Sequence, residues 1–280
     1  HRRMEIALSF VSGVMLGIAV LHLLPHAWME YVAATGEASL AAVESVAMWL
    51  LAGFIVMFLV ERFFCFHHHD APKANGDTPA PAHDHEGCAP GHNHHGSDKN
   101  GRSRHRLSWS GAAIGLTLHT LINGIALGAS TSAEWGHGHE STGLWFAGLG
   151  TFLVIFLHKP FDALTISTLL ATGGHGLKFR HLVNALFALV IPLGVVLFFL
   201  GLDVQSGGAA LFASHALAFS AGAFLCIALS DLLPELQFHQ HDRMQLTLAL
   251  IVGLGMAWGV SQLEHETHAA EHTNDSVLPE

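Results

Sequence analysis

The chain has 280 residues, of which 51% are hydrophobic and only 12% are charged. Its mean hydropathy is +0.42, and because soluble domains usually carry about 25% charged residues, this composition argues against an ordinary soluble domain. The formal net charge is −10, which gives no indication of nucleic-acid binding. The composition therefore predicts an integral membrane protein.

Apolar runs long enough to cross a bilayer, about 20 residues each, follow one another along the chain. We count seven of them, near residues 6–25, 45–63, 108–130, 143–171, 183–201, 208–233 and 244–262. The predicted fold is all-α, a polytopic membrane helix bundle. Its parts are two membrane helices in 1–66, a His-rich loop in 67–106, a five-helix core in 107–262 and a C-terminal tail in 263–280.

The basic residues assign a side of the membrane to each connection, because cytoplasmic loops carry an excess of Lys and Arg. If the spans alternate in direction, every Lys and Arg outside the spans falls on one side. The opposite segments contain acidic residues and no Lys or Arg; they are 27–44, 131–142, 202–207 and 263–280. We therefore expect a cytoplasmic start, seven crossings and an external acidic C-terminal tail, with Lys159 as the one base inside a span.

The first span ends in His22 and His26, which are four residues apart. In this topology they lie at its external end. They are candidates for the first contact of an ion that enters from outside, and the alternative is an interfacial pair that faces water.

The segment between the second and third spans is not membrane-like. Residues 67–106 are rich in Gly, Pro, Asp and His and predict a disordered cytoplasmic loop. Its candidate metal-binding histidines are His67, His68, His69, His83, His85, His92, His94 and His95. With Cys88 they could hold a borderline metal such as zinc loosely, although their spacing fits no closed tetrahedral site. A plain flexible linker is the alternative interpretation.

The third and fourth spans each carry two ligand-type side chains four residues apart. His119 and Asn123 lie in LTLHTLINGIALG, and His158 and Asp162 lie in HKPFD. Residues i and i+4 share a helix face, and unpaired polar groups are costly inside a membrane. Facing pairs would offer two imidazoles, a carboxylate and an amide oxygen, which suit Zn²⁺ or Fe²⁺. A lone histidine of this kind would favour an interhelical hydrogen bond; two matched pairs favour a metal site.

The last two spans carry the remaining candidates. Asp231 and Glu235 lie at the cytoplasmic end of the sixth span, where they could draw an ion toward release or cap a helix that ends at Pro234. Gly255 and Gly259 place small residues on one face of the seventh span, a pattern typical of helix packing.

Four of these stretches, taken in order, resemble one family of membrane transporters. HTLINGIALG is similar to the fourth-helix signature of the ZIP (zinc/iron permease-like) transporters, and HKPFDA resembles their fifth-helix motif. FVSGVMLGIAVLHLLPHA resembles their second helix, and AGAFLCIALSDLLPEL their seventh. A His-rich loop between the third and fourth helices is also typical of that family.

The resemblance implies eight helices with both ends outside the cytosol, so the seven spans would be helices two to eight and the first helix would be absent. It implies a homodimer and a transport metal held by His119, Asn123, His158 and Asp162. Relatives often bind a second metal with polar or acidic residues at the positions of Thr120, Lys159 and Ile191. Since Lys159 is a cation and Ile191 has no donor atom, we expect one metal, with the Lys159 ammonium in the place of the other.

The expected function is transport of a divalent cation, Zn²⁺ first and Fe²⁺, Mn²⁺ or Cd²⁺ as alternatives, into the cytoplasm by alternating access at a midplane site. The resemblance implies a transporter of the plasma (bacterial inner) membrane and not an enzyme. Two other classes also fit helices with membrane-embedded His and Asp residues. One is an intramembrane zinc hydrolase similar to ceramidases, which would need a third histidine and an activated water; the other is a metal sensor or scaffold that does not transport.

Overall fold

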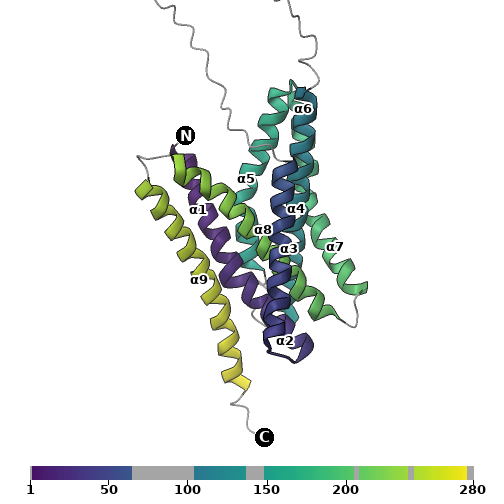
Figure 1. Cartoon of the computed structure of the whole chain (residues 1–280), viewed down its shortest axis with the longest axis vertical. Coiled ribbons are helices and arrows are strands. Elements are labelled where there is room, and N and C mark those ends of the chain that lie inside the picture. The colour runs from purple at the N-terminus through teal and green to yellow at the C-terminus, as the bar shows by residue number, and fades with distance from the viewer. Residues whose placement is uncertain (1, 65–103, 137–147, 205–207, 239–242, 276–280) are drawn as a thin grey trace, which may run out of the picture.

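The computed structural model describes residues 2–64, 104–136, 148–204, 208–238 and 243–275, and within these ranges all regular structure is helical (Figure 1). The helices are α1 (Arg2–Ile18), the π-helix η1 (Ala19–Leu23), α2 (Leu24–Thr35), α3 (Leu40–Phe64), α4 (Arg104–Gly136), α5 (Leu149–Thr172), α6 (Leu177–Ala188), α7 (Val190–Val204), α8 (Ala209–Phe238) and α9 (Arg243–Asp275). The expected all-α architecture is confirmed.

Seven stretches of the described residues are long and apolar enough to cross a membrane, as the sequence predicts. They are Arg3–Thr35, Leu40–Phe63, Gly111–Ala133, Leu149–Thr172, Leu177–Gly201, Ala209–Ser230 and Arg243–Gln262. The first combines α1, η1 and α2, and the fifth combines α6 and α7. The two short helices α6 and α7 meet near Leu189, where Pro192 has no N–H to donate to the carbonyl four residues earlier.

Several helices extend beyond the apolar runs from which the sequence predicts them. Helix α2 continues to Thr35 and ends at Gly36, whose φ of 71° lets its N–H reach back to Val32 O at 2.8 Å. Glu30 therefore lies on a helix and is 7% exposed, whereas the sequence places it in an external connection. Helix α8 continues past Pro234, so the suggested helix end at that residue is wrong.

Helix α8 is the centre of the bundle and packs against α1, α2, α3 and α4 (Figure 1). From Ala209 to Ser230 its residues, apart from His215, are apolar or small on all sides, as expected for a helix surrounded by others. Helix α9 lies on the outside against α1, and α7 lies on the opposite side against α4. Large apolar side chains are exposed on α3, α6, α7 and α9, which is the surface that a lipid bilayer covers.

Two glycines fix the crossing of α4 and α7. A Cβ at Gly124 would meet Ile191 O and Gly194 Cα, and a Cβ at Gly194 would meet Leu121 O and Gly124 Cα. Each glycine therefore lets the other helix approach to backbone contact. Since Gly124 follows Asn123 directly, this crossing also sets the position of the polar residues of α4.

The glycine face of α9 differs from the expected one. Gly253 packs against Phe10 O and Val14 N of α1, whereas Gly255 and Gly259 face open space. Two positions on a helix are about 200° apart, so Gly255 points almost opposite to Gly253. Among the described residues, no helix packs against Gly255 or Gly259, so the structure gives no support to the predicted packing face.

The π-helix η1 follows from a nearby proline and is bonded to a residue far along the chain. Pro25 cannot donate to Leu21 O, the acceptor four residues earlier, so that carbonyl lacks its α-helical donor. Ser261 of α9 supplies a donor, since its hydroxyl donates to Leu21 O at 3.0 Å. One wide turn at 19–23 is therefore tied to α9 beside His22.

Candidate metal site

Helices α4 and α5 bring the four predicted ligands to one place. His119 and Asn123 occupy adjacent turns of α4, and His158 and Asp162 occupy adjacent turns of α5. Asn123 is fully buried, and the two histidines are 5% and 6% exposed. Because each helix contributes residues four apart, each presents two side chains from a single face.

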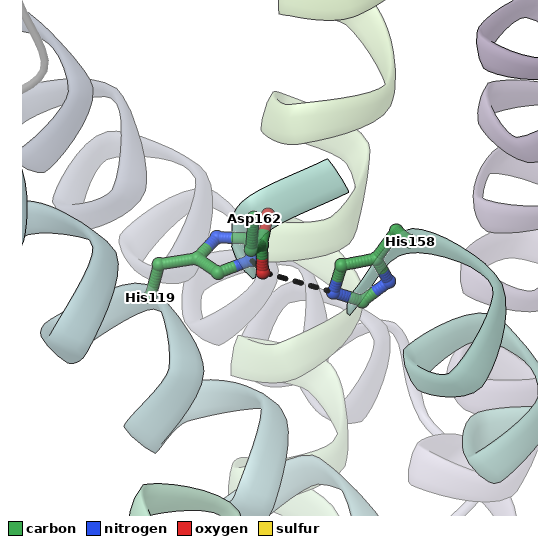
Figure 2. A group of neighbouring side chains, drawn as sticks. All are labelled: His119, His158 and Asp162. Carbon is green, nitrogen blue, oxygen red and sulfur yellow. Dashed lines mark ion pairs between the residues drawn. The ribbon is translucent and has the colours of Figure 1, made fainter. Parts of the chain in front are cut away.

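Three of these residues lie close enough together to hold a metal ion. The ligand atoms of His119, His158 and Asp162 all lie within 4.8 Å of one another, and theirs is the one such group of three among the described residues. Figure 2 shows the Asp162 carboxylate between the two imidazole rings, which come from different helices. Asp162 Oδ2 is 3.6 Å from His119 Nε2 and 3.9 Å from His158 Nε2. Ligands of tetrahedral zinc lie about 3.4 Å apart, so a small closure would complete the site.

The hydrogen bond of His158 to its own helix decides which ring nitrogen is free for a metal. Nδ1 of His158 lies 2.7 Å from Val154 O, and a carbonyl only accepts, so Nδ1 carries the proton. In the neutral ring, Nε2 then has the lone pair and faces the site. Such a backbone hydrogen bond is the usual way in which proteins orient a ligating histidine.

Asn123 lies between the two histidines. Its amide nitrogen is 3.0 Å from His119 Nε2 and 3.0 Å from His158 Nε2. Its carbonyl oxygen Oδ1 is buried and makes no hydrogen bond with the described residues. Asn123 therefore lies beside the other three residues, but its nitrogen, and not the amide oxygen that the sequence predicts as a ligand, faces the rings.

Lys159 and Thr120 lie together on one side of these ligands. The Lys159 ammonium donates to Thr120 Oγ1 at 2.7 Å and is 3.8 Å from Asp162 Oδ2. It also lies 3.6 Å from the centre of the Phe187 ring, a distance at which a cation is attracted by the ring face. Ile191 is a partly buried apolar residue packed against the core.

His22 and His26 lie inside the bundle. They are 1% and 6% exposed, with ring centroids 4.7 Å apart, so the alternative of an interfacial pair facing water is wrong. The reason is that α2 continues the first span beyond them and packs against α8. Nε2 of His22 shares a 3.2 Å hydrogen bond with Ser130 Oγ of α4.

Ser130 is a residue that the sequence interpretation missed. It lies seven residues after Asn123, so it occupies the same face of α4 two turns further on, about 10 Å away. The spacing His119, Asn123, Ser130 was the available signal. Glu30, four residues after His26, is likewise buried on α2.

The remaining predicted residues are less fully described. Asp231 and Glu235 lie in the last part of α8, where the structure describes the backbone helix and not the side chains. The loop histidines His67, His68, His69, His83, His85, His92, His94 and His95, with Cys88, lie outside the described residues. Two residues without a predicted role have partners: Glu61 Oε1 accepts from Ser230 Oγ at 3.3 Å, and His215 stacks on Trp49 with ring centroids 4.8 Å apart.

Comparison with known proteins places the chain in a family. The model of the ZIP zinc transporter family matches residues 1–261. The chain is similar to zinc transporter ZIP9-B of Xenopus laevis, with 30% identity over 224 residues, which are 78% of this chain and 59% of that protein. It is 28% identical to human zinc transporter ZIP13 over 277 residues, which are 91% of this chain and 69% of that protein.

A plant relative gives the same result. Zinc transporter 3 of Arabidopsis thaliana is 23% identical over 266 residues, which are 89% of this chain and 70% of that protein. The chain thus spans between about three fifths and seven tenths of the length of these three relatives.

Proposed function

The chain belongs to the ZIP zinc transporter family, and from this premise we propose that it carries a divalent transition-metal ion, Zn²⁺ in the first place, across a membrane into the cytoplasm. The observation that supports this most is the meeting of two imidazoles, a carboxylate and an amide in a buried position of α4 and α5. Asn123 lies beside the middle of the span Gly111–Ala133, and His158 and Asp162 flank the middle of Leu149–Thr172. A bilayer around these spans would hold the ion near its midplane.

The four ligands would replace the water around the ion. Zinc accepts imidazole nitrogen and carboxylate oxygen at about 2.0–2.2 Å, and Nε2 of His158 already has its lone pair toward the centre. Asp162 supplies the negative charge that offsets the cost of placing a divalent cation in an apolar interior. Fe²⁺, Mn²⁺ and Cd²⁺ are possible cargoes of the same donor set.

We expect a single ion at this site. Positions that could hold a neighbouring ion are occupied by Thr120 and by the Lys159 ammonium, which donates to the Thr120 hydroxyl. A second divalent cation there would be repelled by Lys159. Lys159 would also reduce the net negative charge that Asp162 offers to the bound ion, because the two are 3.8 Å apart.

The pathway from outside would pass the buried histidine pair. His22, His26 and Ser130 lie on the side of the site that the charge distribution makes external. The ion would move from this pair along the face of α4 to His119 and Asn123. Alternating access would follow from a shift of α4 and α5 against the helices around α8.

The cytoplasmic end of the proposed pathway is inferred from the sequence alone. Asp231 and Glu235 would draw the ion out of the site, and the loop histidines of 67–106 would receive it as buffer or sensor. The basic residues of the same side support this direction, as does an external C-terminal tail without Lys or Arg. The resemblance to relatives suggests a homodimer in the plasma (bacterial inner) membrane.

The alternatives have weaker support. An intramembrane hydrolase needs a third imidazole and a metal-bound water, whereas this site combines two imidazoles with Asp162 and Asn123. His22 is hydrogen-bonded to Ser130 and packs against His26, and His215 stacks on Trp49. A sensor would bind the ion with the same residues and would not move it.

Metal uptake into proteoliposomes tests the proposal. We expect saturable ⁶⁵Zn²⁺ uptake by the native chain, loss of that uptake in His158→Ala, and native uptake in His181→Ala, which removes an exposed histidine of α6. Metal binding without uptake would support a sensor. Lipid hydrolysis without uptake would support the hydrolase, and either result would refute transport.

A further inference from the structure

The amide group of Asn123 has only one orientation that the surrounding hydrogen bonds permit. If Oδ1 faced the rings, Nε2 of both histidines would have to carry a proton. His158 already uses its Nδ1 proton on Val154 O, so it would become a second buried cation, and it would have to share the Asp162 carboxylate with Lys159. With the NH₂ group toward the rings, two neutral histidines accept one hydrogen bond each, and no charge is added.

In this orientation the Nε2 lone pairs of both histidines accept a hydrogen bond in the empty site. The two N–H groups of Asn123 satisfy two Nε2 lone pairs at 3.0 Å each. Asp162 Oδ2 lies beyond hydrogen-bond distance from both Nε2 atoms, so it does not compete for them. This orientation has a desolvation cost, because Asn123 Oδ1 is buried without a hydrogen bond from the described residues.

The same orientation cannot persist when an ion is bound. The ion needs both Nε2 lone pairs that the amide protons occupy, and an amide nitrogen that donates two protons is not a ligand. A half-turn of the amide about χ2 would withdraw the NH₂ group and bring Oδ1 to the ion.

We propose that Asn123 is an amide lock: its NH₂ group closes the empty site by holding the two histidines, and its rotation offers Oδ1 as the fourth ligand. The proposal rests on the proposed function, because it concerns the state of the same site before and after the cargo enters. It gives the amide a role that a carboxylate could not fill, since a carboxylate cannot donate to two neutral imidazoles.

The lock has a consequence for affinity. Cargo binding must break two buried hydrogen bonds, so the native site binds more weakly than one whose fourth ligand is always turned toward the ion. A weaker site also releases its cargo more readily. We therefore infer that Asn123 makes the site easier to empty, at the expense of equilibrium affinity.

The rotation can be observed directly by NMR of the full chain in nanodiscs with ¹⁵N-labelled asparagine. The Asn123 side-chain signals are identified by their disappearance in Asn123→Asp and in Asn123→Ser. We expect these signals to move when Zn²⁺ is added. Asn184 is the internal control, because its Nδ2 donates to Ser167 Oγ at 2.7 Å, away from the site, and should not move.

Stability and binding give a second readout. In a chelating buffer, Asn123→Asp should unfold at a lower temperature than the native chain, because both histidines lose a donor. It should bind Zn²⁺ about tenfold more tightly or better, the effect expected when two hydrogen bonds need not be broken. Asn184→Asp, the matched variant, should leave Zn²⁺ affinity unchanged.

These experiments distinguish failure of the amide lock from failure of the proposed metal site. If native Asn123 signals stay fixed at saturating Zn²⁺, or if metal-free Asn123→Asp is as stable as the native chain, the lock is refuted while metal binding stands. If His158→Ala binds Zn²⁺ like the native chain, the site itself is refuted, and the lock with it. Movement of the Asn123 signals together with the loss of stability supports the lock.

Discussion

The Lys159 ammonium donates a 2.7 Å hydrogen bond to Thr120 Oγ1 and at the same time lies 3.8 Å from Asp162 Oδ2. One cation therefore joins α5 to α4 within the candidate metal site. It is further held over the ring of Phe187, which belongs to α6. The lysine is fixed by three partners and has little freedom to leave when a metal arrives.

Neutralising Lys159 should therefore strengthen binding of the first ion. Two unit charges about 4 Å apart interact by about 4 kcal/mol at an effective dielectric constant of 20, so even a partial release of Asp162 gives a large effect. We expect Lys159→Met to bind Zn²⁺ at least about tenfold more tightly in titration calorimetry. Lys178→Met, which removes an exposed lysine on α6, should not change the affinity.

The number of bound ions tests the role of Lys159 as a replacement for a second metal. Native chain should hold one Zn²⁺ per polypeptide at this site, measured by elemental analysis with His158→Ala as the background for loop binding. Lys159→Asp, which exchanges the cation for a ligand, should raise that number toward two. Two ions at the native site would contradict this interpretation.

The sequence predicted which polar side chains of α4 and α5 come together, because the physical signal was local. His119 with Asn123 and His158 with Asp162 are recognisable from a four-residue spacing inside apolar runs, where polar groups are expensive. The burial of His22 could not be read in this way, since it depends on how α2 and α4 pack. The orientation of the Asn123 amide depends on a hydrogen bond between His158 and Val154, which spacing does not reveal.

The glycine pattern of α9 shows the same limit. A GxxxG spacing gives the separation of two glycines along a helix, but it does not say which way they face. Gly253 meets α1, and Gly255, two residues later, lies on nearly the opposite side. Only the packing of the neighbouring helix separates these two possibilities.

The hydrogen bond between His22 and Ser130 should matter for transport and not for equilibrium binding. Ser130 is about 10 Å from Asn123 along α4, so its removal leaves the ligands in place. We expect Ser130→Ala to slow Zn²⁺ uptake by about two- to tenfold, the range for one lost hydrogen bond. Equal loss of uptake and of binding affinity would show instead that the change disturbs the metal ligands.

Gly124→Ala tests the close crossing of α4 and α7, and Gly255→Ala on α9 is its matched control. Gly124→Ala places a methyl group against Ile191 O, and such overpacking costs about 1–3 kcal/mol. Gly255→Ala adds the same group into open space, where it should be neutral or stabilise the helix by up to about 1 kcal/mol. Thermal unfolding in detergent measures both, and equal effects of the two variants would refute the close crossing.

Ser261 and Pro25 should be energetically coupled through Leu21 O. In the native chain, Ser261→Ala removes the hydroxyl that donates to this carbonyl and should cost about 1 kcal/mol. In a Pro25→Ala background the new backbone N–H can donate to Leu21 O, so Ser261→Ala should lower the free energy of unfolding very little. A double-mutant cycle measures the difference between the effects of Ser261→Ala in the two backgrounds.

Ser9 provides the control for this cycle, since its hydroxyl donates to Leu246 O at 2.8 Å, far from Pro25. Ser9→Ala should therefore destabilise both backgrounds equally. If Ser261→Ala also lowers the free energy of unfolding equally in the two backgrounds, then Ser261 does not stabilise the chain by donating to the Leu21 O atom that Pro25 leaves without a donor. In that case the wide turn that carries His22 would have to be held by its packing against the neighbouring helices, α8 among them.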